Sequence, residues 1–204
     1  MQKKRYYKGR EPPREDVIEY WNNILKHKPK VEKVLDVGCG TGFFGKHKPK
    51  GEIQVYGCDI DEHALRIAQK HEITRKCDLE SYALPYENKY FDAVIAKDIL
   101  EHLLKPWLLV KEMKRVLKNG GIALATVPDY RSKTLWDDYT HVKGYTRQSL
   151  RLLFEDQGFK TLEIRPYGGI PGFGKLKLKK EVPLLLTKPL FKRFLSGWVY
   201  VGKK

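Results

Sequence analysis

The sequence predicts an α/β fold: a Rossmann-like, mostly parallel sheet of seven strands, with helices on both faces and an antiparallel strand at one edge. Short, almost continuously apolar strands alternate with helical segments along the 204 residues, as in parallel sheets covered on both faces. The last two predicted strands have no crossover helix between them, so we expect one of them to be antiparallel. Neither a repeat nor a linker interrupts the pattern, which favours a single domain.

The elements follow in order from the N-terminus. Apolar residues recur at helical spacing after Pro12-Pro13 and predict a helix over about 16–28, so residues 1–30 are interpreted as an N-terminal helical extension. Seven apolar runs predict the strands, the third of them weakly: 33–38, 53–59, 73–78, 91–97, 122–128, 159–167 and 198–202.

Three further helices are predicted between these strands. One begins at Asp61, which is placed to be its N-cap. The next runs from Pro106 to Gly120-Gly121, since proline favours the first turn of a helix and glycine its end. The last has Thr146 as its N-cap and Gly158 at its C-terminal end.

The net charge of +15 is typical of nucleic-acid-binding proteins, but it is unevenly distributed. Residues 31–157 carry twenty Lys and Arg against nineteen acids, whereas residues 1–30 carry nine against four and residues 158–204 eleven against two. The excess therefore lies at the two ends. Such ends are compatible with RNA, an anionic membrane, an acidic metabolite, or simply a solvated surface.

The sequence also indicates a compartment. It has no apolar run long enough to span a membrane and no apolar core of a secretory signal. Cys39, Cys58 and Cys77 form no CxxC pair, so we expect small buried thiols in a reducing cytoplasm and no metal site.

A glycine-rich loop, residues 38–42, connects the first sheet strand to the next helix. Its glycines Gly38, Gly40 and Gly42 allow a tight turn and close approach to a ligand. Ligands of open α/β folds bind at this edge of the sheet. Asp59 ends the next strand, 21 residues after Gly38, near the spacing of about 20 at which an acid accepts the hydroxyls of a bound ribose.

The bound molecule is predicted to be cationic at the glycine loop. The spacing GxGxG differs from the GxGxxG of dinucleotide enzymes. Asp36, two residues before the first glycine, would repel a pyrophosphate but attract a sulfonium and an ammonium group. This favours S-adenosylmethionine over NAD.

Five segments together resemble one family. VLDVGCGTG resembles the first motif of class I S-adenosylmethionine-dependent methyltransferases, and YGCDIDEHAL their second-strand motif. CDLESYALPYENKYFDAVIAKDILEHL is similar to their adenine loop and fourth strand, and RVLKNGGIALATVP to the fifth. THVKGYTRQSLRLLFEDQGF is similar to a segment of the small-molecule branch called type 11. The resemblance covers roughly residues 31–165 and implies that 1–204 form one methyltransferase domain.

The resemblance implies the cofactor, S-adenosylmethionine, and the residues that bind it. Those around the methionine part would be Asp36, Gly38, Cys39, Gly40 and Gly42, those at the ribose Asp59 and Ile60, and those at the adenine Asp78 and Leu79. Lys97 would line the floor near the sulfonium. A lysine there departs from the family pattern, because two cations repel, so its ammonium is expected to point away.

Catalytic candidates follow the fourth and fifth strands. We predict His141 as the base that removes a proton from the acceptor, because an unperturbed imidazole pKa suits that role; the alternative is a histidine that only anchors its loop. The other candidates are His102, Asp129 and the Asp137-Asp138 pair. Four aromatic residues are candidates for an acceptor-pocket wall or for loop packing: Tyr130, Trp136, Tyr139 and Tyr145.

Three functions stay open. The first is methyl transfer to a small-molecule, glycan or lipid-linked acceptor. The second is RNA methylation through the basic ends, although KDIL stands where base-methylating enzymes have an NPPY-like tetrapeptide. The third is a non-catalytic, cofactor-binding partner subunit. Residues 168–197 mix apolar runs with lysines and are interpreted as a lid, with contact to an anionic membrane or an interface as alternatives.

Overall fold

A seven-stranded sheet forms the centre of the molecule in the computed structural model, which describes residues 14–81, 83–168 and 195–204. The strand order is β3-β2-β1-β4-β5-β7-β6. The first five strands in this order are parallel, and β7 is antiparallel to both β5 and β6. The predicted fold class is confirmed, with the reversed strand lying next to the edge strand.

The strands are β1 (Lys33–Val37), β2 (Gln54–Asp59), β3 (Ile73–Lys76), β4 (Phe91–Lys97), β5 (Leu117–Pro128), β6 (Lys160–Gly168) and β7 (Leu195–Lys203). The α-helices are α1 (Arg14–His27), α2 (Phe43–Lys46), α3 (Glu62–Ala68), α4 (Pro106–Val116), α5 (Lys133–Trp136) and α6 (Arg147–Glu155). The described residues also include two single turns of 3-10 helix, η2 (Leu79–Ser81) and η3 (Leu100–His102).

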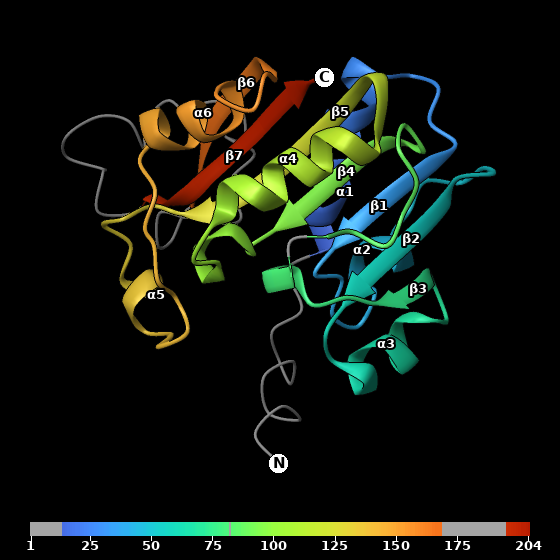
Figure 1. The fold of residues 1–204 in the computed structure, drawn as a ribbon, viewed down its shortest axis with the longest axis horizontal. Coiled ribbons are helices and arrows are strands. Elements are labelled where there is room, and N and C mark those ends of the chain that lie inside the picture. The colour runs from blue at the N-terminus through green and yellow to red at the C-terminus, as the bar shows by residue number, and fades with distance from the viewer. Residues whose placement is uncertain (1–13, 82, 169–194) are drawn as a thin grey trace.

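Alternation along each strand divides the core into two layers, one on each face of the sheet. In β1, for example, Leu35 and Val37 pack into the layer beneath α4 and α6, whereas Val34 packs on the opposite face with α1 and α2. Figure 1 shows α4 and α6 in front of the sheet and α1 and α2 behind it. Because both faces are covered, the central strands are apolar almost throughout.

The N-terminal helix is an integral part of one core layer. Trp21 of α1 is buried, stacks on Phe44 of α2 with 4.2 Å between ring centroids, and donates its indole N–H to the Phe44 carbonyl at 3.2 Å. The helix predicted over 16–28 is thus present, shifted by two residues at its start. Val17 and Tyr20 of this helix line the cavity that is described in the next subsection.

One predicted boundary is wrong. The helix expected to reach Gly120-Gly121 ends at Val116, because Leu117 leaves the helical conformation and pairs with Phe91 of β4. Gly120 instead takes a positive φ of 73° inside the longer β5 segment. The caps at Asp61 and Thr146 are both confirmed, and Gly158 adopts the positive φ expected after a helix.

Two further expectations concern surfaces. Within the described ranges, the helices lack the length and apolar character required to cross a membrane. The lid interpretation of residues 168–197 falls almost entirely on residues 169–194, outside the described residues.

All three cysteines are buried and free, as expected.

Candidate functional site

A cavity of about 410 Å³ lies at the carboxyl ends of β1, β2 and β4. The chain reverses its direction of strand addition between β1 and β4, which is where open α/β sheets bind ligands. Of the predicted cofactor residues, those that line this cavity are Asp36, Gly38, Cys39, Gly40, Asp59 and Lys97. The structure therefore brings the methionine and ribose parts of the prediction together in one cavity.

The glycine loop turns sharply against the end of β2. The backbone N–H groups of Gly38 and Cys39 both donate to the Cys58 carbonyl, at 2.8 and 3.1 Å. Gly38 has a φ of 71°, and a Cβ there would come within 2.1 Å of the Ile99 side chain. Only glycine combines this conformation with such a close approach.

Asp59 fixes the loop from the end of β2. Its buried carboxylate accepts from the backbone N–H of Gly40 at 3.0 Å and from that of Asp61 at 2.9 Å. Asp61 has a different role: its carboxylate accepts from the N–H groups of His63 and Ala64 and so caps α3. The prediction that Asp61 is the N-cap is confirmed, and Asp59 is left as the acid that faces the cavity.

Asp36 is the second buried acid of the cavity. Burial raises its pKa well above the usual range, and the neighbouring Glu72 carboxyl adds to the effect while Lys97 opposes it. A carboxyl in such surroundings gains from a cationic ligand, because a nearby positive charge offsets the loss of water. A bound sulfonium or ammonium group fits this site, and a pyrophosphate does not.

Lys97 ends β4, and its ammonium pairs with the adjacent carboxylate of Asp98. Burial is the largest single influence and would lower the pKa of Lys97, but the charge and hydrogen bond of Asp98, together with the charges of Glu101 and Asp36, raise it. The lysine therefore lines the cavity with its charge matched by Asp98. This explains how a lysine is accommodated beside the place expected for a sulfonium.

The other predicted cofactor residues do not line the cavity. Gly42 is the N-cap of α2, with a φ of 77°, and Ile60 is 45% exposed. Asp78 is exposed and accepts from the N–H of Glu80, next to the half-buried Leu79. Since β3 runs parallel to β2, Asp78 and Leu79 lie at the same carboxyl edge as Asp59, and their adenine role stays a prediction.

Two histidines from different segments meet at the opposite side of the cavity. His102 from η3 and His141 from the loop before α6 have ring centroids 4.5 Å apart, and both line the cavity together with Asp137 and Asp138. His141 donates its Nδ1–H to the Leu135 carbonyl, 2.6 Å away. A carbonyl only accepts, so Nε2 of the neutral ring holds the lone pair.

Asp129 and the aromatic candidates lie elsewhere. The buried Asp129 carboxylate accepts from Arg131 Nε and Trp198 Nε1, both at 2.8 Å, which makes it a link between loop and sheet. Of the aromatic candidates, Tyr145 packs the loop onto the fold, since it is buried and its hydroxyl donates to the Leu100 carbonyl. Tyr130, Trp136 and Tyr139 are exposed and do not line this cavity, so a role in an acceptor-pocket wall stays a prediction. The aromatic side chains that do line the cavity are Tyr20, Phe43, Phe44 and Tyr167.

Sequence reasoning missed Glu101. It lines the cavity and is only 1% exposed, and burial raises its pKa well above the usual range. The signal was present, since an acid stands beside His102 in a short segment bounded by Leu100 and Leu103. The proximity of Glu101 to His141 could not be predicted from the sequence, because His141 comes from a distant loop.

Comparison with known proteins agrees with this geometry. Residues 35–125 match the family described as "Methyltransferase domain". These residues, a little under half of the chain, are assigned to the class I S-adenosylmethionine-dependent methyltransferases. The family predicted from the sequence, whose cofactor is S-adenosylmethionine, is thereby confirmed.

Individual relatives of the methyltransferase domain differ in their reactions. The chain is 35% identical over 96 residues to a ubiquinone biosynthesis O-methyltransferase of Idiomarina loihiensis, covering 44% of this chain and 40% of the relative. It is 26% identical over 152 residues to a phosphoethanolamine N-methyltransferase of Triticum aestivum, covering 72% and 28%. The chain thus spans less than half the length of these curated relatives.

Solved structures share the fold. A methyltransferase structure from Archaeoglobus fulgidus superimposes with a TM-score of 0.73 at 23% identity, covering 94% of each chain. At this identity the likeness concerns the fold of the methyltransferase domain.

Proposed function

We propose that this chain transfers the methyl group of S-adenosylmethionine to a small-molecule, glycan or lipid-linked acceptor held in the cavity between the glycine loop and the two histidines. The observation that carries the proposal is the charge of the cavity. Its acidic lining residues are Asp36, Asp59, Asp98, Glu101, Asp137 and Asp138, and Lys97 is the single Lys or Arg that lines it in the described part of the chain.

The glycine-loop side suits the cofactor. S-adenosylmethionine supplies a methyl group activated by a sulfonium, so the protein mainly has to position the acceptor and receive its proton. Gly38 and Gly40 give a ligand access to the backbone, while the buried carboxyls of Asp36 and Asp59 favour its positive charges and its ribose hydroxyls.

The histidine side suits an acceptor with a hydroxyl or amine. His141 lines the cavity, and its Nδ1–H bond to the Leu135 carbonyl leaves Nε2 to receive a proton. A cavity of about 410 Å³ has room for a small molecule or for the end of a longer one. The names of the two relatives above, one a ubiquinone biosynthesis O-methyltransferase and one a phosphoethanolamine N-methyltransferase, support acceptors of this kind.

RNA is the alternative acceptor. In its favour are the basic ends of the chain, although more than half of their basic residues lie in 1–13 and 169–194, outside the described residues. Against it is the acidic lining, because a polyanion loses free energy on entering a cavity of like charge. The non-catalytic reading requires cofactor binding without any transfer.

Two measurements together separate the three functions. The full chain is incubated with S-adenosylmethionine labelled on the methyl group and either total RNA or an extract of lipids and metabolites. We expect label in the extract and not in RNA, and the reverse result would replace the proposal by RNA methylation. Calorimetry with S-adenosylmethionine and with NAD is the companion measurement: cofactor binding without label in either pool would support the non-catalytic reading, and binding of NAD alone would contradict the cofactor.

A further inference from the structure

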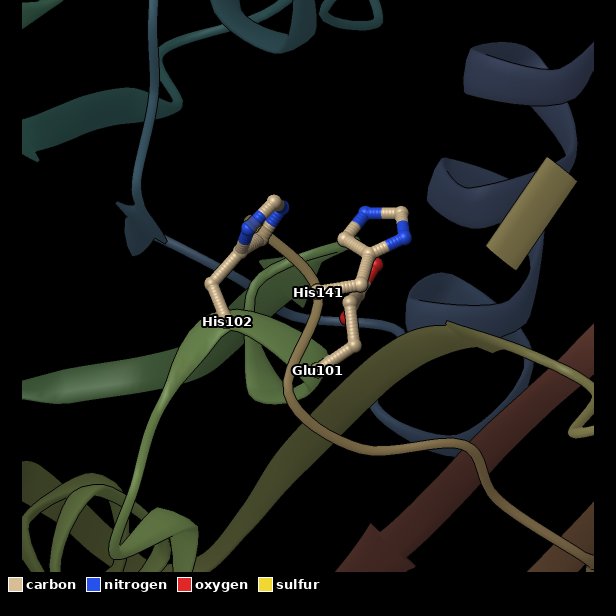
Figure 2. A group of neighbouring side chains, drawn as sticks. All are labelled: Glu101, His102 and His141. Carbon is tan, nitrogen blue, oxygen red and sulfur yellow. The ribbon is translucent and has the colours of Figure 1, made fainter. Parts of the chain in front are cut away.

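Three side chains of metal-binding type meet at the histidine side of the cavity: Glu101, His102 and His141. One potential donor atom of each lies within 4.8 Å of those of the other two. Figure 2 shows the Glu101 side chain directed toward the two imidazole rings. Two of these residues come from η3, after β4, and the third comes from the loop that precedes α6, so only the fold assembles the group.

The Glu101 carboxyl is buried in the lining of the cavity. The residue is 1% exposed, and within residues 14–81, 83–168 and 195–204 neither carboxyl oxygen has a hydrogen-bond donor. Burial raises the pKa of this carboxyl well above its usual range, and the nearby charge of Asp98 adds to the effect. Burial without hydrogen-bond donors disfavours the ionised form of a carboxyl group, so the site gains from a ligand that brings positive charge.

In both histidines, Nδ1 takes part in a hydrogen bond. The Thr140 hydroxyl donates to Asp138 Oδ1 at 2.6 Å, so its oxygen is left to accept from Nδ1–H of His102 at 3.0 Å. His141 Nδ1–H donates to the Leu135 carbonyl. In each neutral ring the proton is therefore on Nδ1, and Nε2 carries the lone pair. Metal-binding histidines are typically oriented in this way, by a hydrogen bond from the other ring nitrogen.

We propose that Glu101, His102 and His141 bind one divalent transition-metal ion of the class that prefers imidazole and carboxylate ligands, with zinc as the representative. Two histidines with one glutamate are a common ligand set for zinc, whereas magnesium and calcium prefer oxygen alone. Ligand bonds of about 2.0–2.2 Å place the donors of a tetrahedral site roughly 3.4 Å apart, so modest side-chain rotation closes the group around an ion.

The ion would lie where the acceptor is expected. All three residues line the cavity, so a coordination position not taken by protein would face it. A hydroxyl bound there would have a lowered pKa and would lose its proton to water. With the ion bound, His141 would therefore be a ligand and not the base. This use of the ion rests on the proposed methyl transfer, but binding of the ion does not.

The test uses the untagged full chain after treatment with a chelator. Titration with Co²⁺ is followed by the visible absorption of the bound ion, and titration with Zn²⁺ by calorimetry, both without S-adenosylmethionine. We expect one ion per chain, and an affinity at least roughly tenfold weaker in Glu101→Gln and in His141→Ala. His63→Ala removes an exposed histidine of α3 and is the matched control, with unchanged affinity expected.

Thermal unfolding supplies a readout that does not depend on activity. Zn²⁺ should raise the unfolding temperature of the unaltered chain and of His63→Ala, but not of Glu101→Gln, because an ion that binds only the folded state stabilises it. Absence of one-to-one binding, or equal affinity in Glu101→Gln, His141→Ala and the unaltered chain, would overturn the proposal. Cofactor binding and methyl transfer are measured separately, so a failed metal site leaves the proposed function intact, and a failed transfer leaves the metal site intact.

Discussion

Asp59 connects the glycine loop, the next helix and the expected ribose position through one carboxylate. Both of its oxygens accept from backbone N–H groups, one on Gly40 and one on Asp61. The same residue therefore shapes the loop and presents a negative charge to the cavity. Asp61, two residues later, uses its carboxylate only at the start of α3.

These two roles predict different outcomes for two substitutions. Asp59→Asn should weaken binding of S-adenosylmethionine by roughly tenfold to a hundredfold, because a hydrogen bond to a charged group contributes about 1.5–3 kcal/mol. Asp61→Ala should instead lower the free energy of unfolding by about 1 kcal/mol, the usual cost of a lost N-cap, with cofactor affinity little changed. Calorimetry and chemical denaturation measure the two quantities.

The comparison is informative because the two aspartates are so close. Loss of cofactor binding in Asp61→Ala, with binding retained in Asp59→Asn, would mean that the acid of the ribose site has been assigned to the wrong residue. Equal losses in both variants would point to general damage to the loop.

At the scale of elements, the position of the glycine loop depends on how closely α2 approaches α3. Gly42 starts α2 with a φ of 77°, and a Cβ there would come within 2.8 Å of the Ala68 Cα in α3. A backbone atom cannot move aside as a flexible side chain can. The close approach of α2 to α3 is therefore possible only because Gly42 has no side chain.

Gly42→Ala should consequently destabilise the fold by roughly 2–4 kcal/mol, from backbone strain together with overpacking. Gly51→Ala is the matched control, since Gly51 also has a positive φ, of 134°, but nothing lies within 4 Å of an added Cβ. It should cost on the order of 1 kcal/mol from strain alone. Urea denaturation of both variants gives the comparison, and similar losses would show that packing against α3 contributes little.

At the scale of the whole molecule, acidic and basic residues are unevenly distributed. The chain as a whole carries +15, yet among the charged residues that line the cavity in the described part of the chain, six are acidic and one is a lysine. A further acid, Glu72, lies beneath the glycine loop, where Oε1 accepts from the Gly45 N–H at 2.9 Å. Burial raises the pKa of Glu72 to about 7, although that hydrogen bond opposes the rise.

This pKa predicts how global stability depends on pH. Because the folded-state pKa of Glu72 exceeds the ordinary value of 4.5, the unfolded chain releases its proton first as pH rises. The contribution of Glu72 to the free energy of unfolding is therefore fully present below about pH 4.5 and is lost by about pH 7. The loss is roughly 3 kcal/mol at most. Glu72→Gln should make this decline shallower, as measured by thermal unfolding across that range, while the raised pKa values of Asp36 and Glu101 leave part of it in place.

Glu52→Gln is the control, because Glu52 is exposed and its substitution should leave the pH profile of the unaltered chain in place. If Glu72→Gln loses stability with rising pH as steeply as the unaltered chain does, the decline has another origin.

The sequence by itself determined the parallel core of the sheet, the glycine loop and the caps at Asp61 and Thr146. These follow from local causes: apolar runs, backbone conformations open to glycine, and side chains that bond to nearby N–H groups. The alternation of strands and helices predicts parallel strands whose carboxyl ends meet at one edge, and Asp36, Asp59 and Lys97 lie at that edge.

Only the tertiary structure decided the acceptor side of the cavity. His102 and His141 are far apart in the sequence, and Glu101 gains significance only when the loop carrying His141 closes over it. The end of α4 was decided in the same way, because pairing of Leu117 with Phe91 outweighed the glycine signal three residues later. Contacts between distant segments depend on packing and burial, which no local pattern of residues records.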